Sequence, residues 1–103
     1  MHKALVLLKK IPKGKVTTYK ALAKACNSSP RAIGQIMKRN KYPEVYPCYK
    51  VICSDGCIGG YAGKIKGKKI KEKIEKLRKD GIIFKNGRIN KKYFYKFELN
   101  KNK

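Results

Sequence analysis

A cysteine stands near the centre of the segment Y-P-C-Y-K-V-I-C, residues 46–53. Because a thiolate is a strong nucleophile, Cys48 is a candidate for attack on an electrophilic carbon. It could equally be a metal ligand, or a small core residue of a strand, since β-prone residues follow it. The four cysteines (26, 48, 53 and 57) contain no C-x2-C pair, and the one histidine is His2. We therefore predict reduced thiols and no metal site.

The chain is strongly basic: 28 Lys and Arg stand against six Asp and Glu, a formal net charge of +22. Such an excess repels itself unless a polyanion compensates it, so nucleic acid is the expected partner. Two other interpretations stay open, namely lysine as surface filler and binding to an anionic membrane surface. No apolar run approaches the roughly 20 residues that cross a bilayer. The apolar run at 4–8 is too short for a secretory signal, so we expect an intracellular protein.

The first half of the sequence predicts three helices. Residues 3–10 form a short apolar helix that ends at a turn with Pro12 and Gly14. Thr17 or Thr18 can cap a helix over 19–26, and Ser29 can cap a helix over 30–40 whose first residue is Pro30. The last two helices around a three-residue turn favour a helix-turn-helix, with an ordinary helical hairpin as the alternative.

The second half predicts smaller β elements around another helix. Residues 48–53 are expected to form a strand, and the Gly-rich stretch after it a hairpin or wing. A helix is predicted over 64–79, and 81–89 form a hairpin around Asn86-Gly87, which the tail to residue 96 could extend. Residues 97–103 are expected to be disordered. The fold class is thus a single, mainly α domain over 1–103 with small β elements, of the winged helix-turn-helix type.

Three motifs carry a family resemblance: I-P-K-G-K-V-T-T-Y-K-A-L-A, S-P-R-A-I-G-Q-I-M-K-R-N and P-C-Y-K-V-I-C-S-D-G-C-I-G-G-Y-A-G. In this order and spacing, over residues 4–80, they resemble the C-terminal domain of O6-alkylguanine-DNA alkyltransferases. The resemblance implies a single-turnover methylated-DNA–protein-cysteine methyltransferase. Such a protein binds duplex DNA through the minor groove, flips the damaged guanine out and takes the alkyl group on its own cysteine. It implies a monomer without cofactor or metal. The family's N-terminal domain has no counterpart here, and we expect its role to be missing or supplied elsewhere.

The resemblance also implies roles for individual residues. Cys48 would accept the alkyl group, Asn40 would brace the active-site turn, and Glu75 would close the family's hydrogen-bond chain. Tyr19 would press on the rotating phosphate, and Arg31 would fill the gap left by the flipped base. Other DNA contacts would come from the second helix of the helix-turn-helix, at Ala32, Gly34 and Lys38. The substrate pocket would be formed by Pro47, Val51, Ile52, Gly59, Gly60, Tyr61 and Gly63.

Each of three assignments has a simpler alternative. Arg31 could be a plain phosphate contact, because such contacts dominate protein–DNA interfaces. Tyr19 could be a half-buried core aromatic. Glu75 could be one half of a surface pair with a neighbouring lysine of its helix.

The sequence departs from the family pattern directly after the cysteine. The family's P-C-H-R-V is P-C-Y-K-V here, so Tyr49 replaces a histidine that acts as base and Lys50 replaces an arginine. A phenol is a poor base at pH 7, although an ordinary thiol is still about 3% thiolate there. The positive charge around Cys48 should raise that fraction. Three hypotheses follow: an alkyltransferase, a lesion-binding protein with an idle cysteine, and a basic winged-helix DNA-binding protein.

Overall fold

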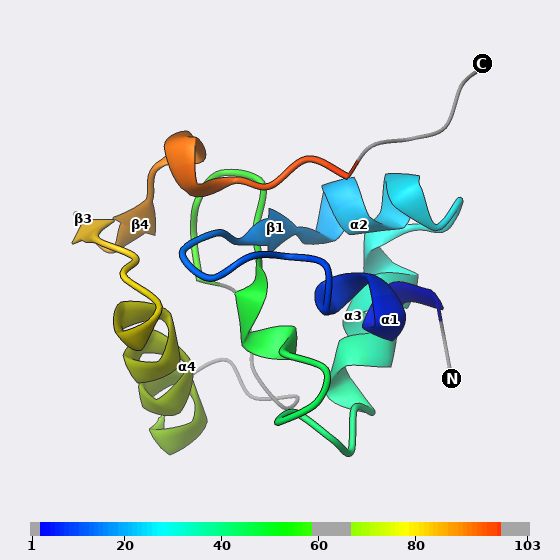
Figure 1. Cartoon of the computed structure of the whole chain (residues 1–103), viewed down its shortest axis with the longest axis horizontal. Helices are drawn as coiled ribbons and strands as arrows, with labels where there is room; N and C mark the ends of the chain where they lie inside the picture. The colour runs from blue at the N-terminus through cyan, green and yellow to red at the C-terminus, as the bar shows by residue number, and fades with distance from the viewer. Residues whose placement is uncertain (1–2, 59–66, 98–103) are drawn as a thin grey trace.

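The computed structural model describes residues 3–58 and 67–97 (Figure 1). Its elements, in chain order, are α1 (Lys3–Leu8), β1 (Thr17–Thr18), α2 (Tyr19–Ala25), α3 (Pro30–Lys38), the 3-10 turn η1 (Cys48–Lys50), β2 (Val51–Ile52), α4 (Lys68–Lys79), β3 (Phe84–Lys85), β4 (Arg88–Ile89) and the 3-10 turn η2 (Lys91–Tyr93). The mainly α prediction with small β elements is confirmed. Gly59, Gly60, Tyr61 and Gly63, predicted in the wing, and the tail from 98 lie outside the described residues.

The two helices of the predicted helix-turn-helix begin at the expected caps. The Thr18 hydroxyl accepts a hydrogen bond from the Ala21 N–H at 2.9 Å, and the Ser29 hydroxyl accepts one from the Ala32 N–H at 3.1 Å. These side chains satisfy N–H groups that a helix start otherwise leaves unpaired. Between the helices, Asn27 has a φ of 55°, a left-handed conformation that Asn tolerates and that turns the chain sharply. The local sequence therefore sets the angle between α2 and α3.

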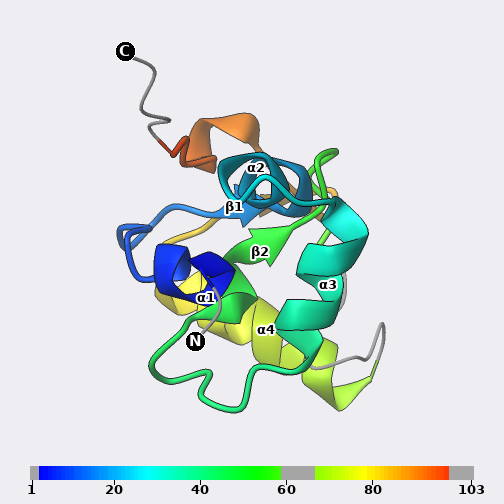
Figure 2. The same cartoon turned by 90° about the vertical axis from the view of Figure 1, so that its right-hand side faces the viewer.

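A two-stranded parallel pair joins the helix-turn-helix to the cysteine segment. Thr17 pairs with Val51 and Thr18 with Ile52, and all four residues are buried. Because β1 runs directly into α2, this pairing brings the first turn of α2 beside the end of β2 (Figure 2). Residues 34 positions apart in the sequence are thus positioned for one site.

The strand predicted over residues 48–53 is wrong in its first half. Cys48–Lys50 form a 3-10 turn, and only Val51 and Ile52 are a strand. Pro47 has φ −73° and ψ 75°, and the Cys48 N–H donates to the Tyr46 carbonyl at 2.7 Å, which is an inverse γ-turn. The proline ring holds φ near this value and so favours a turn over an extended chain, whatever the β propensity of the residues that follow.

The C-terminal half contains the predicted hairpin but not the predicted continuation. β3 and β4 pair antiparallel around Asn86 and Gly87, whose positive φ angles of 54° and 74° are those of a type I′ turn. The next residues form η2 instead of more strand, because the Asn90 side chain caps it by accepting the Lys92 N–H at 2.9 Å. The helix expected over 64–79 begins at Lys68 among the described residues.

Two hydrophobic clusters meet at the cysteine segment. The first is built from α1, α2, α3 and η1 and includes Cys48 and Val51. The second is Val16, Ile52, Leu77, Ile82 and Ile89. Tyr49 packs against both clusters. In Figure 1, η1 and β2 lie between α4 on one side and α2 with α3 on the other. The segment that carries the candidate nucleophile is therefore held from both sides.

Candidate active site and DNA-binding surface

Cys48 is the first residue of η1, with 7% of its surface exposed. The Tyr46 carbonyl accepts the Cys48 N–H and also the Asn40 side-chain amide, at 2.8 Å. The Asn40 side-chain oxygen accepts the Tyr42 N–H at 3.0 Å. Asn40, just beyond α3, thus ties the helix-turn-helix to the turn that presents the thiol.

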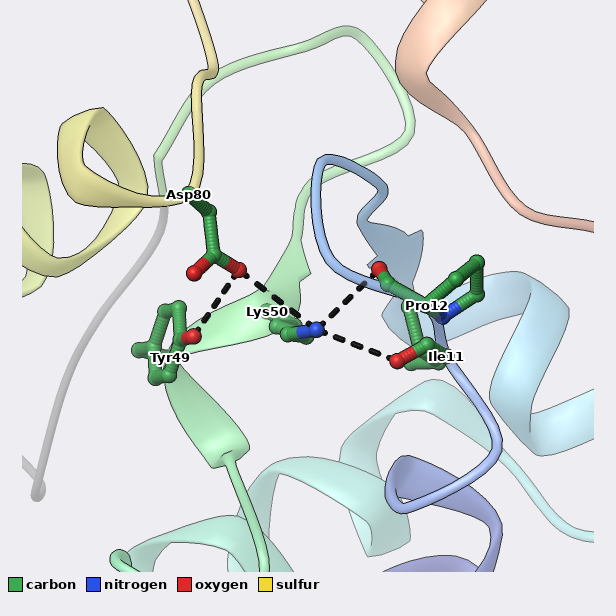
Figure 3. A network of polar contacts seen from close by, with 5 residues as sticks. All are labelled: Ile11, Pro12, Tyr49, Lys50 and Asp80. Atoms are coloured by element: carbon green, nitrogen blue, oxygen red, sulfur yellow. Dashed lines mark hydrogen bonds and ion pairs between the residues drawn. The ribbon is translucent and has the colours of Figure 1, made fainter.

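A network of polar groups holds the two residues after Cys48 (Figure 3). The Tyr49 hydroxyl donates to Asp80 Oδ2 at 2.9 Å. The Lys50 ammonium lies 3.4 Å from the same oxygen and donates to the carbonyls of Ile11 and Pro12 at 3.1 and 3.2 Å. Lys50 is 5% exposed, so this ion pair is shielded from water. The network fixes the phenol against a carboxylate and anchors η1 to the turn before β1.

The carboxylate beside position 49 is Asp80, and not the predicted Glu75. Glu75 is exposed on α4, whereas Asp80 follows the last turn of that helix. The Asp80-Gly81 pair predicts where α4 ends, since glycine favours a helix C-terminus, but it does not predict which carboxylate faces position 49. The exposure of Glu75 agrees with the alternative of a surface pair with a neighbouring lysine of its helix.

Lys73 is a second residue near the cysteine turn that was not predicted from the sequence. Its side chain is fully buried, and its ammonium donates to the carbonyls of Val51 and Ile58 at 2.7 and 2.6 Å. In α4 the buried residues are Lys73 and Leu77, whereas Ile70 and Ile74 are half-buried. Lys73 lies three residues after Ile70 and four residues before Leu77, so helical spacing places it on the same face as these two apolar residues. This spacing was the signal in the sequence that Lys73 could be buried.

An open pocket of about 500 Å³ lies where the helix-turn-helix meets the end of β2. It is lined by Tyr19, Lys20, Pro30, Arg31, Gly34, Cys53 and Ser54. Tyr19 comes from the first turn of α2, and Arg31 and Gly34 come from α3. The pocket joins three of the predicted DNA-binding residues to the loop after β2.

The side chains on this surface differ in exposure. Arg31 and Lys38 are exposed at the two ends of α3, and Ala32 and Gly34 are partly exposed between them. Burial, with smaller contributions from Cys53 and Cys48, raises the pKa of Tyr19 to about 12. Its phenol is therefore neutral at physiological pH and can approach a phosphate without repulsion.

Two residues predicted for the substrate pocket lie in the hydrophobic core. Val51 and Ile52 are fully buried, one in each hydrophobic cluster, and do not line the pocket beside Tyr19. Pro47 is partly exposed at the turn before Cys48. Within the described residues, no group of three or more His, Cys, Asp or Glu side chains could hold a metal ion. None of the described helices is long and apolar enough to cross a membrane.

Residues 1–82 match the family model for the DNA-binding domain of 6-O-methylguanine DNA methyltransferase. The chain belongs to this family. A methylated-DNA–protein-cysteine methyltransferase of Thermococcus kodakarensis is 50% identical over 72 residues, which are 70% of this chain and 41% of the relative. A bifunctional methyltransferase/endonuclease of Picrophilus torridus is 49% identical over 90 residues, 85% of this chain and 28% of the relative. The chain thus spans less than half of both curated relatives.

Two solved structures match as well. The O6-methylguanine-DNA methyltransferase of Pyrococcus kodakaraensis has a TM-score of 0.68 at 46% identity, over 78% of this chain and 44% of that one. S. pombe Atl1, solved in complex with damaged DNA containing O6-carboxymethylguanine, has a TM-score of 0.76 at 26% identity, over 91% and 92% of the two chains. The family resemblance and the winged helix-turn-helix fold class are confirmed. The chain is a DNA-binding domain of the methyltransferase type used in DNA repair.

Proposed function

We propose that this protein repairs O6-alkylguanine in duplex DNA by moving the alkyl group to Cys48. The observation that carries the proposal is the position of Cys48 in the family domain. It begins a turn that Asn40 ties to α3, next to a helix-turn-helix with a strongly basic surface. A cysteine with only a packing role would not require a proline turn and an amide brace to orient it.

The reaction needs only the protein and the damaged base. The Cys48 thiolate attacks the alkyl carbon bound to O6, the carbon–sulfur bond forms and the carbon–oxygen bond breaks. The electron pair of the broken bond remains on the guanine, which takes up one proton, so the thiol proton is balanced by the proton on the product. The thioether does not revert, and each chain therefore acts once.

DNA would be bound by α3 and the first turn of α2. Flipping a base costs a few kcal/mol of stacking and pairing, so a side chain that occupies the vacated space lowers the cost. Arg31, exposed at the start of α3, has a planar guanidinium suited to this task. The neutral phenol of Tyr19 would press on the phosphate that rotates. We expect the protein to act as a monomer inside the cell.

A second candidate function is recognition of the lesion without transfer. The observation that favours it is Tyr49, which stands at the position of the family's histidine base. Its hydroxyl donates a hydrogen bond to Asp80 and does not take the thiol proton in the way that a histidine would. The match to S. pombe Atl1 along nearly the whole of both chains adds to it. A third candidate is a basic winged-helix protein with no preference for damaged DNA, which the charge and the helix-turn-helix alone would favour.

One pair of measurements separates the three candidates. The protein is mixed with a duplex that carries one O6-methylguanine, and its intact mass and its affinity are compared with those for the undamaged duplex. Transfer predicts a gain of one methyl group, absent in Cys48→Ala. Lesion-selective binding without a gain of mass would overturn transfer and support the second candidate. Equal affinity for both duplexes, again without a gain of mass, would support the third.

A further inference from the structure

One lysine of α4 differs from the others in its environment. Lys69, Lys71 and Lys79 are exposed, as expected for a helix on the surface of a basic protein, but Lys73 is fully buried. Placing an ammonium group in the interior is costly unless polar groups solvate it. Here the carbonyl oxygens of Val51 and Ile58 do so at 2.7 and 2.6 Å. The protein therefore places a positive charge at a defined point in its interior.

That point lies beside the turn that carries Cys48. Val51, whose carbonyl binds the Lys73 ammonium, directly follows η1, and α4 packs against η1. Cys48 and Lys73 are both buried, at 7% and 0% exposure. Water and salt screen such a pair much less than they screen charges at the surface. The positive charge of Lys73 therefore lies in a part of the interior where water does not screen it from the turn that carries Cys48.

The titration of Lys73 agrees with this geometry. Burial lowers the pKa of Lys73 from 10.5 to about 8, and negative charge on Cys48 and on Cys53 acts in the opposite direction. The side chain is thus mostly an ammonium at pH 7.

We propose that Lys73 is a positioning residue for the methyltransferase reaction, whose buried ammonium stabilises the thiolate form of Cys48. The thiol proton leaves to water, and Lys73 keeps its own proton. The side chain at position 49 is engaged elsewhere, since its hydroxyl donates to Asp80. The inference deepens the proposed function and rests on it, because a stabilised thiolate has a role only if Cys48 accepts the alkyl group. Its test is independent of methyl transfer.

Several titratable groups surround this lysine. Among the described residues, the titratable groups on η1, directly after β2 and at the end of α4 are Cys48, Tyr49, Lys50, Cys53 and Asp80. Lys50 and Asp80 are paired with each other, so their charges largely cancel at Lys73. The reactivity of the two thiols is therefore what a change in the charge of Lys73 should alter most.

The test measures the reactivity of Cys48 in the protein without DNA. Methyl methanethiosulfonate, a reagent of methyl size, is added at pH values from about 6 to about 10, and mass spectrometry of peptides gives the labelling rates of Cys48 and Cys26. Cys26, at the end of α2, is the internal reference. Wild type is compared with Lys73→Gln, which removes the charge but keeps a donor, and with Lys71→Gln, which removes an exposed charge from the same helix.

In Lys73→Gln the Cys48 rate should fall about tenfold or more at neutral pH, with Cys26 unchanged and Lys71→Gln like wild type. The difference in the Cys48 labelling rate between wild type and Lys73→Gln should become smaller above pH 8, because Lys73 in the wild type loses its proton there. Equal Cys48 rates at neutral pH, a difference that is constant with pH, or no labelling of Cys48 at any pH would overturn the proposal. A purely structural role for Lys73 predicts the constant difference.

A second measurement leaves Lys73 in place, in case Lys73→Gln does not fold. The Lys73 side chain is titrated by carbon NMR in wild type and in Cys48→Ser, which is nearly the same size. Loss of the thiolate should move the Lys73 midpoint to lower pH, whereas an unchanged midpoint would show that the two groups do not interact. Neither measurement uses methyl transfer. Failure of the proposed repair function would therefore appear as missing transfer with the Lys73 effects intact.

Discussion

At the scale of single residues, the site differs from its family in which groups surround the nucleophile. Tyr49, directly after Cys48, donates a hydrogen bond to Asp80. The family pattern has a histidine at this position, with a glutamate as its hydrogen-bond partner. The Tyr49 hydroxyl already donates its hydrogen bond to Asp80. A phenol is in any case a weak base at neutral pH. The structure thus has the frame of an acid–base pair without the group that takes up a proton at neutral pH.

Restoring the imidazole tests this view of position 49. In Tyr49→His the ring can donate to Asp80 with one nitrogen and accept the thiol proton, through water, with the other. We expect methyl transfer to become about tenfold faster or more, with its optimum at lower pH. Single-turnover rates from an O6-methylguanine duplex, measured across pH, give both quantities. An unchanged rate would mean that activation of Cys48 does not depend on position 49.

At the scale of the elements, two glycines of the site region have opposite surroundings. Gly34 lies within α3, and an added Cβ would meet no atom within 4 Å. Gly56 has a φ of +91°, and an added Cβ would lie 2.7 Å from the Ile89 carbonyl oxygen. The turn over residues 53–56 therefore depends on glycine for its contact with β4, whereas α3 does not depend on it for folding.

The same substitution at both positions should change stability in opposite directions. Gly34→Ala should stabilise the protein by about 0.5 to 1 kcal/mol, because alanine favours the helix. Gly56→Ala should destabilise it by about 2 kcal/mol or more through strain and the clash with Ile89. Urea denaturation measures both. If α3 enters the groove at Gly34, the stabilised variant should also bind duplex DNA more weakly, and unchanged binding would argue against that placement.

How far the elements follow from the sequence depends on what determines each one. The caps at Thr18 and Ser29 and the Asn86-Gly87 turn use local chemistry and were predicted. The 3-10 turn at Cys48 was not, because its cause is a γ-turn at Pro47 that overrides the β propensity of the residues after it. Asp80 and Lys73 were missed because their partners are distant in the sequence.

At the scale of the whole molecule, the net charge of +22 should dominate DNA affinity. The logarithm of the binding constant should fall steeply and linearly with the logarithm of the salt concentration, by about 0.9 for each phosphate neutralised. Lysines account for nearly all of this charge, so most contacts should be independent of sequence. If the protein prefers damaged DNA, as proposed, we expect the preference to come from the few side chains at the pocket beside Tyr19.

The salt dependence separates the two roles considered for Arg31. If Arg31 fills the space of the flipped base, Arg31→Ala should lose affinity mainly for the damaged duplex and keep the salt slope of wild type. Lys38→Ala, at the exposed end of α3, is the matched control and should reduce the slope by about 1 on any duplex. Fluorescence titrations at several salt concentrations give both slopes. A reduced slope for Arg31→Ala would identify it as a phosphate contact instead.

Stability should also depend on pH through the buried lysine. The pKa of Lys73 is about 8 in the folded protein and 10.5 ordinarily, so between these values the unfolded chain binds more protons. The free energy of unfolding should therefore rise by about 1 to 3 kcal/mol as pH increases through this window. Urea denaturation at pH values across the window measures the rise. Lys73→Met should lack it, and a similar rise in that variant would assign it to other groups.

The central claim is that Cys48 takes an alkyl group from DNA, and peptide mass spectrometry after one incubation tests it most directly. The protein is mixed with excess duplex containing O6-methylguanine, digested, and analysed for methyl groups on all four cysteines. We predict one methyl group per chain, on Cys48 alone, with unmodified guanine left in the duplex. Unmodified Cys48 in a protein that has bound the damaged duplex would contradict the claim.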